Sequence, residues 1–177
     1  MISYDQAIQL IISQAKPAPP TSVKADESLG MVCVERVVSR KNLPAFNSSA
    51  MDGFAVSATQ TALATPDSPI LALPVSQRIE AGAFHIDHRF GQCVEITTGA
   101  VVPDAFDAVI AYEQVDHIKY EAGTAKSINL SRAAKSHQNV RLKGEDIQIG
   151  SILIEPGTQI RASHIAAINQ YPQGKSG

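Results

Sequence analysis

Residues 47–54 read NSSAMDGF, a hydroxyl-rich turn that ends in Asp-Gly directly before an apolar stretch. Asn, Ser, Asp and Gly favour turns, because the polar side chains hydrogen-bond to nearby backbone and Gly adopts left-handed conformations. Such a turn can direct backbone N–H groups and the Asp52 carboxylate into a cleft. The simpler alternative is an Asx-type turn that leads into a hairpin and binds nothing, which is the commoner use of these residues.

Two further segments combine glycine with hydroxyl or charged side chains. Residues 97–103 read TTGAVVP after a predicted strand, and hydroxyls with free backbone donors at a strand end suit an anionic ligand. Residues 141–147 read RLKGEDI, where two cations and two adjacent carboxylates could hold a phosphate together with Mg²⁺. A plain β-turn and a solvated surface turn are the respective alternatives, so each segment alone leaves the function open.

The apolar pattern around these segments predicts a mainly β chain with flanking helices, an α+β fold. Ser3 and Gln6 fit a capping box, and an apolar stripe at helical spacing follows until prolines at 17, 19 and 20 end the helix. We expect this stripe to pack against the rest of the chain or a second copy. A second helix is predicted over 162–171, and residues 61–68 read as a surface loop. Short β-branched stretches predict strands over 32–38, 54–56, 70–75, 93–97, 108–112, 115–120, 127–130 and 152–154.

Composition excludes several classes of protein. The formal net charge is −2, and aromatic residues make up 5% with no Trp, which argues against a nucleic-acid binder. Two cysteines far apart in the sequence do not suggest a disulfide scaffold. The chain has neither a signal-peptide pattern at its start nor an apolar run of transmembrane length, so we expect a cytoplasmic protein that binds no membrane.

Taken together and in this order, the three segments resemble the MoeA family, the molybdopterin molybdenumtransferases related to the E domain of gephyrin. NSSAMDGFAV at 47–56 resembles the family's PPFDNSAMDGYAV, and residues 95–113 resemble RIxTGAxxPxGADAVVxxE. Residues 139–147 resemble NVRxxGEDI, and residues 150–160 resemble GxxLLxxGTxL. The chain departs from the family at residues 47–48, Asn-Ser in place of Asp-Asn, and at Phe54 in place of Tyr.

This resemblance covers nearly the whole chain and implies a function. The family inserts molybdate into adenylated molybdopterin, with Mg²⁺, and releases AMP and molybdenum cofactor. Its members are elongated homodimers, whose active site lies between an α/β domain of one subunit and a β subdomain of the other. For this chain it implies a terminal helix-containing dimerisation subdomain at 1–25 plus 141–177, with a mostly β subdomain at 26–140 inserted.

The molybdopterin-binding α/β domain and the C-terminal β domain of the family are not in the chain, so the isolated chain is expected to be inactive. The partners implied are a second copy, the pterin substrate and other proteins of molybdenum cofactor biosynthesis. The alternative is a non-catalytic dimerisation or scaffold module from a truncated gene product. By motif match, Asp52, Thr98 and Asp146 fall on family positions linked to activity, so we expect them to be catalytic. The chemistry of the residues agrees: Asp52 and Asp146 are expected to bind Mg²⁺, and substrate binding is expected of Ser49, Gly99, Arg141 and Lys143.

Overall fold

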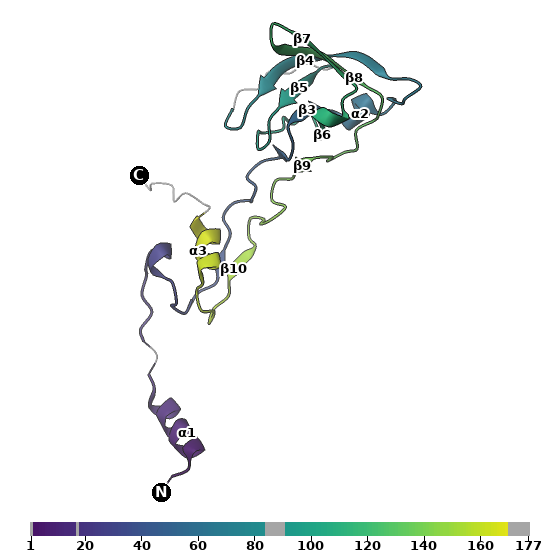
Figure 1. Cartoon of the computed structure of the whole chain (residues 1–177). Helices are drawn as coiled ribbons and strands as arrows, with labels where there is room; N and C mark the ends of the chain where they lie inside the picture. Colours follow the sequence, from purple (N-terminus) through teal and green to yellow (C-terminus); the bar gives the residue numbers. More distant parts are fainter. Residues whose placement is uncertain (1, 17, 84–90, 170–177) are drawn as a thin grey trace. The chain divides into compact units, whose positions relative to one another are not determined.

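The computed structural model describes residues 2–16, 18–83 and 91–169 and divides the chain into two compact units (Figure 1). The terminal unit comprises residues 1–37 and 152–177, and the central unit comprises residues 38–151. The boundaries expected from the sequence, at 25/26 and 140/141, differ from these. The difference has a physical reason, because residues 30–33 hydrogen-bond to 157–160 and residues 39–43 hydrogen-bond to 146–151.

The first helix of the terminal unit, α1 (Tyr4–Gln14), begins as the sequence predicts. The Ser3 backbone N–H donates to Gln6 Oε1 at 3.0 Å, and the Gln6 backbone N–H donates to Ser3 Oγ at 3.2 Å, which completes the capping box. In the described part of the chain no residue of α1 is buried. Ile11 is 65% exposed and Ile12 61% exposed, so the apolar stripe is not covered by the described residues.

The remainder of the terminal unit is short elements joined by backbone hydrogen bonds. It contains η1 (Ala25–Glu27), β10 (Ile152–Ile154) and α3 (Ala162–Asn169). The strand β1 (Val37–Val38), which pairs with β10, begins at the last residue before the central unit. The strand predicted over 32–38 is therefore shorter than expected, because Val32 makes only an isolated bridge. The last two residues of the helix predicted over 162–171 lie outside the described residues.

A mixed sheet forms the core of the central unit. Its strands are β3 (Gly53–Val56), β4 (Ile70–Ile79), β5 (Cys93–Ile96), β6 (Ala108–Ala111), β7 (His117–Glu121) and β8 (Thr124–Leu130). Within the described ranges the order is β6-β3-β5-β4-β8-β7, with β4 and β5 parallel and the other neighbours antiparallel (Figure 1). The prediction of a mainly β chain with flanking helices is confirmed.

Successive residues of β3, β5 and β6 pack into two hydrophobic clusters, one on each face of the sheet. Phe54, Cys93 and Ile110 belong to one cluster, and Ala55 and Val94 to the other. This follows from the period of two along a strand, which sends neighbouring side chains to opposite faces. Because both faces are covered, these three strands read as nearly continuous apolar runs without regular polar alternation.

The region predicted as a surface loop over 61–68 is partly buried, and the prediction is wrong at Thr61 and Ala64. A short helix, α2 (Ala58–Thr61), precedes the turn, and Thr61 is 0% exposed. Its Oγ1 accepts a hydrogen bond from the Ala134 backbone N–H at 3.0 Å. A threonine has an apolar methyl group beside its hydroxyl, so it can fill the core and still satisfy a buried donor. Nothing local in the sequence marks that partner.

The helices of the described residues are short. Judged over residues 2–16, 18–83 and 91–169, none is long and apolar enough to cross a membrane.

Candidate functional site

The three segments singled out in the sequence meet in the central unit at β2 (Ser48–Ser49). This strand pairs antiparallel with β9 (Val140–Arg141), so Ser48 lies opposite Arg141 and Ser49 opposite Val140. Ser48 also forms a bridge with Val101, which belongs to the second segment. One short strand therefore joins residues that lie about fifty and about ninety positions further along the chain.

Asn47 strengthens this junction with both of its oxygens. Its side-chain Oδ1 accepts the Lys143 backbone N–H at 2.8 Å, and its backbone oxygen accepts the Val102 N–H at 2.9 Å. In the family pattern this position is Asp. An amide oxygen accepts an N–H bond as a carboxylate oxygen does, so the exchange removes a charge and keeps the acceptor.

Asp52 and Thr98 join the first two segments through two hydrogen bonds to the Asp52 carboxylate. The Thr98 backbone N–H donates to Asp52 Oδ1 at 2.6 Å, and the Thr98 hydroxyl donates to the same oxygen at 2.8 Å. These two hydrogen bonds lower the pKa of the Asp52 carboxyl below its ordinary value, and the bond from the Thr98 backbone N–H has the larger effect. The charge of Arg78 lowers this pKa further. Asp52 is thus held as a carboxylate, and its Oδ2 has no hydrogen-bond partner among the described residues.

Ser49 and Gly99 use their polar groups within the protein. The Gly99 N–H donates to the Ser49 backbone oxygen at 2.8 Å, and the Ser49 N–H donates to the Ala100 oxygen at 2.9 Å. The Ser49 side chain is buried and its hydroxyl donates to the Met51 oxygen at 2.5 Å. Gly99 has a φ of +80°, a conformation that disfavours any side chain. In this geometry both residues hold the two turns together.

The third segment contains a shared ion pair. Arg141 Nε donates to Glu145 Oε1 at 2.7 Å, and Arg141 Nη2 donates to Asp146 Oδ2 at 2.7 Å. The hydrogen bond from Arg141 is the main cause that lowers the pKa of the Glu145 carboxyl. The two bonds orient Asp146 and leave its Oδ1 without a partner in the part of the chain that the structure describes. The Lys143 ammonium likewise has no partner within the described ranges.

Sequence reasoning missed a second polar group beside Asp52, formed by Arg78, Glu95 and Tyr112. Glu95 is 5% exposed, and its Oε1 accepts the Tyr112 hydroxyl at 2.5 Å. Arg78 Nη1 lies 3.8 Å from the same carboxylate oxygen. Burial, followed by the bond to Glu95, raises the pKa of the Tyr112 hydroxyl well above its ordinary value. The signal available in the sequence was the single acid in the apolar run CVEI at 93–96.

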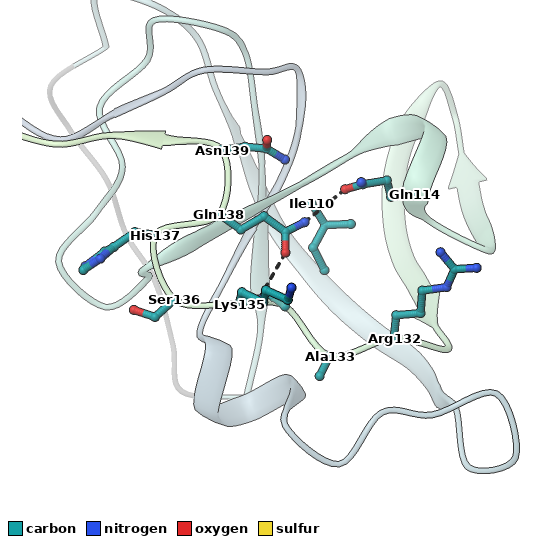
Figure 2. Close-up of a pocket in the computed structure, with 10 residues that line it drawn as sticks. Ile110, Gln114, Arg132, Ala133, Lys135, Ser136, His137, Gln138 and Asn139 are labelled. Carbon is teal, nitrogen blue, oxygen red and sulfur yellow. Dashed lines mark hydrogen bonds between the residues drawn. The ribbon is translucent and has the colours of Figure 1, made fainter.

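A separate pocket of about 620 Å³ lies along the loop 132–139, bordered by Ile110 and Gln114 (Figure 2). Figure 2 shows Gln138 between its two partners: its Nε2 donates to Gln114 Oε1 at 3.1 Å, and its Oε1 accepts the Lys135 N–H at 3.1 Å. None of the site residues expected from the sequence lines this pocket. It adjoins the junction of the three segments at Asn139, whose backbone oxygen accepts the Ala50 N–H at 2.9 Å.

The described residues do not contain three His, Cys, Asp or Glu side chains grouped closely enough to bind a metal ion by themselves. Mg²⁺ does not require such a group, since it commonly binds one or two carboxylates together with substrate phosphates and water. Asp52 and Asp146, each with one unpartnered oxygen among the described residues, are suitable donors for that mode of binding.

Comparison with known proteins gives a consistent result. The family model "MoeA N-terminal region (domain I and II)" matches residues 2–171. The molybdopterin molybdenumtransferase of Staphylococcus epidermidis is 32% identical over 173 residues, which cover 96% of this chain and 39% of that protein. The Haemophilus influenzae protein of the same name is 34% identical over 162 residues, covering 90% of this chain and 37% of the relative.

A solved structure titled molybdopterin biosynthesis MoeA protein from Pyrococcus horikoshii is similar with a TM-score of 0.79 at 28% identity. The match covers 96% of this chain and 44% of that one. The chain thus spans about two fifths of the length of the relatives that it matches.

Proposed function

Since the chain belongs to the family of the MoeA N-terminal region, we propose that it is the N-terminal part of a cytoplasmic molybdopterin molybdenumtransferase. In this proposal the whole enzyme inserts molybdate into adenylated molybdopterin, with Mg²⁺, and releases AMP and molybdenum cofactor. The observation that carries the proposal is the junction at β2, where segment 47–54 is hydrogen-bonded both to segment 97–103 and to segment 139–147.

Asp52 and Asp146 would hold Mg²⁺ through their unpartnered oxygens, and substrate phosphates would complete the coordination. The metal ion would supply neutralisation of the phosphate charge. Thr98 fixes the Asp52 carboxylate through two hydrogen bonds and keeps it ionised. Arg141 orients Asp146, and the Lys143 ammonium is available to a negatively charged group of the substrate.

Activity is proposed for the intact protein and not for this chain alone. The relatives are more than twice as long as the part they share with it, so residues beyond the shared part would complete the pterin pocket. In this proposal the 177-residue chain binds part of the substrate and does not turn it over.

The experiment that tests the function uses Asp52→Asn in the intact protein. Asn keeps an oxygen that accepts from Thr98, and it removes the charge that Mg²⁺ requires. AMP release from adenylated molybdopterin should fall about 10- to 100-fold, the effect of one lost charge-assisted interaction. Asp67→Asn, at an exposed turn in the same unit, is the control and should leave the rate unchanged. Undiminished turnover in Asp52→Asn would remove Asp52 from the site.

A dimerisation role is the second function, and the exposed apolar face of α1 favours it. We expect two copies to associate through this face, with or without catalysis. Ile11→Glu should convert a dimer, measured by light scattering after size exclusion, into a monomer. Ser13→Glu on the same helix is the matched control and should remain dimeric. A dimer that persists in Ile11→Glu would exclude α1 as the interface.

A further inference from the structure

A row of polar side chains crosses the central sheet at the edge of one hydrophobic cluster. In the strand register Phe54 of β3 lies opposite Glu95 of β5, and Glu95 lies opposite Arg78 of β4. Residues paired in this way face the same side of the sheet. Asp52 and Glu80 lie just beyond the ends of β3 and β4; Glu80 Oε1 is 3.5 Å from Arg78 Nε, and the charge of Arg78 contributes to the lowered pKa of Asp52. The row therefore leads from the core to the Asp52–Thr98 contact.

Glu95 holds Arg78 at this place. A buried carboxylate is costly unless hydrogen bonds and a nearby cation compensate it. Tyr112 supplies the hydrogen bond at 2.5 Å, and the Tyr112 ring in turn packs edge-on against Phe54 with centroids 5.3 Å apart. Arg78 supplies the cation, with Nη1 at 3.8 Å from Glu95. The charge of the buried Glu95 carboxylate thus keeps the Arg78 guanidinium close to the core.

The Arg78 guanidinium itself is open to a ligand. Its side chain is 52% exposed, and its contacts with Glu80 at 3.5 Å and Glu95 at 3.8 Å are longer than N–H···O hydrogen bonds. Over the described residues it makes these ion pairs and no hydrogen bond. A guanidinium has five N–H donors in a planar fork that matches two oxygens of a phosphate or a similar oxyanion. Arg78 is therefore oriented and electrostatically engaged, with its donors unused.

We propose that Arg78 is a substrate-binding residue of the Asp52–Thr98 site, which donates paired N–H bonds to a tetrahedral oxyanion. Glu95 and Tyr112 are its positioning residues. The ligand class rests on the proposed function, in which the oxyanion is either the phosphate of the adenylated pterin or molybdate. Both anions offer the same kind of hydrogen-bond-accepting oxygens. Separate binding measurements with each anion therefore decide between them.

Isothermal titration calorimetry of the intact protein tests the proposal with two probes, AMP and sodium molybdate, in separate titrations. Arg78→Gln should weaken the binding of at least one probe about 10- to 100-fold, the loss expected for a charge-assisted bidentate contact. Arg132→Gln, which removes a cation beside the separate pocket at 132–139, should change neither affinity by more than about twofold. Equal binding of both probes by wild type and Arg78→Gln, or no binding of either by wild type, would overturn the proposal.

Two further variants separate ligand binding from support of the fold. If Arg78 serves only to neutralise Glu95, then Arg78→Gln with Glu95→Gln removes both charges and should restore wild-type binding. A substrate-binding Arg78 predicts that this double variant stays as weak as Arg78→Gln. Arg78→Lys keeps the charge without the planar fork and should recover part of the affinity. It also provides the measurement if Arg78→Gln does not fold, as judged by thermal unfolding.

Turnover measurements test the proposed function separately from the role of Arg78. A wild-type protein that binds a probe through Arg78 and releases no AMP from adenylated molybdopterin would refute the proposed reaction and leave the role of Arg78 intact. A wild-type protein that releases AMP at a rate and KM unchanged by Arg78→Gln would refute the role of Arg78 alone.

Discussion

Gly53 is the position where a single methyl group should disturb both the sheet and the site. It pairs with Ile96 on one side and Ala111 on the other. A Cβ at Gly53 would lie 2.0 Å from the Ile110 backbone oxygen and 2.8 Å from Ala111 Cα. Both atoms belong to the backbone of β6, so no side-chain rotation relieves the overlap. Gly53→Ala therefore requires β3 and β6 to separate.

The magnitude follows from the kind of atom that must move. Overpacking a core costs about 1–3 kcal/mol in the free energy of unfolding where side chains can adjust. A clash with backbone atoms should cost at least the upper value of this range. We expect a loss of about 3 kcal/mol or more in the free energy of unfolding, which lowers the melting temperature by roughly 6–12 °C for a chain of this size. Asp52 directly precedes Gly53, and the Asp52 backbone oxygen accepts the Tyr112 N–H at 3.3 Å. Separation of β3 and β6 should therefore displace Asp52, so AMP release should fall as well.

Urea denaturation followed by circular dichroism measures this loss, and Gly123→Ala is the control. Gly123 has a φ of +76° and nothing within 4 Å of its Cβ position, so alanine there meets only left-handed strain of about 1–2 kcal/mol. Gly53→Ala must cost more than Gly123→Ala. A cost equal to or below the control would refute the close approach of β3 and β6 at Gly53.

Three further predictions concern the polar groups of the same unit. Thr98→Val removes one of the hydrogen bonds that lower the pKa of Asp52, so this pKa should rise toward its ordinary value in a ¹³C NMR titration. The stability that ionised Asp52 contributes is present above the pKa of the unfolded state and is lost as pH falls through the pKa of the folded state. The loss of stability at acid pH should therefore be smaller in Thr98→Val than in wild type. Tyr112→Phe leaves the buried Glu95 carboxylate without its donor and should reduce the free energy of unfolding by about 1–3 kcal/mol in urea. Burial raises the pKa of the Cys93 thiol to about 12, so iodoacetamide at pH 8 should leave Cys93 unmodified in the native protein and alkylate it in urea, as read by peptide mass spectrometry.

Controls for these variants come from exposed residues of the same types. Thr124→Val at the start of β8 should not move the pKa of Asp52, and Tyr120→Phe, at a side chain that is 53% exposed, should leave stability nearly unchanged. A shift of the Asp52 pKa in Thr124→Val, or a loss in Tyr120→Phe as large as that in Tyr112→Phe, would contradict the assigned contacts. Rapid alkylation of native Cys93 would contradict its burial.

The sequence by itself determined the local elements and the family. The capping residues Ser3 and Gln6 mark the start of α1, because a cap is built from neighbours three positions apart. The apolar runs at 93–96 and 108–111 mark buried strands for the same kind of reason, since backbone conformation and strand period are local properties. The order of the three polar segments identified the family, while the roles of Asp52, Thr98 and Asp146 stay predictions.

Tertiary structure alone decided which distant residues meet. Lys143 hydrogen-bonds to Asn47 across 96 positions, and the parallel register of β4 and β5 sets Arg78 opposite Glu95. Thr61 is buried and accepts the Ala134 N–H, although its neighbours in the sequence read as a loop. These outcomes depend on strand register and on how loops close, which arise from packing over the whole unit and have no signature in any short stretch of sequence.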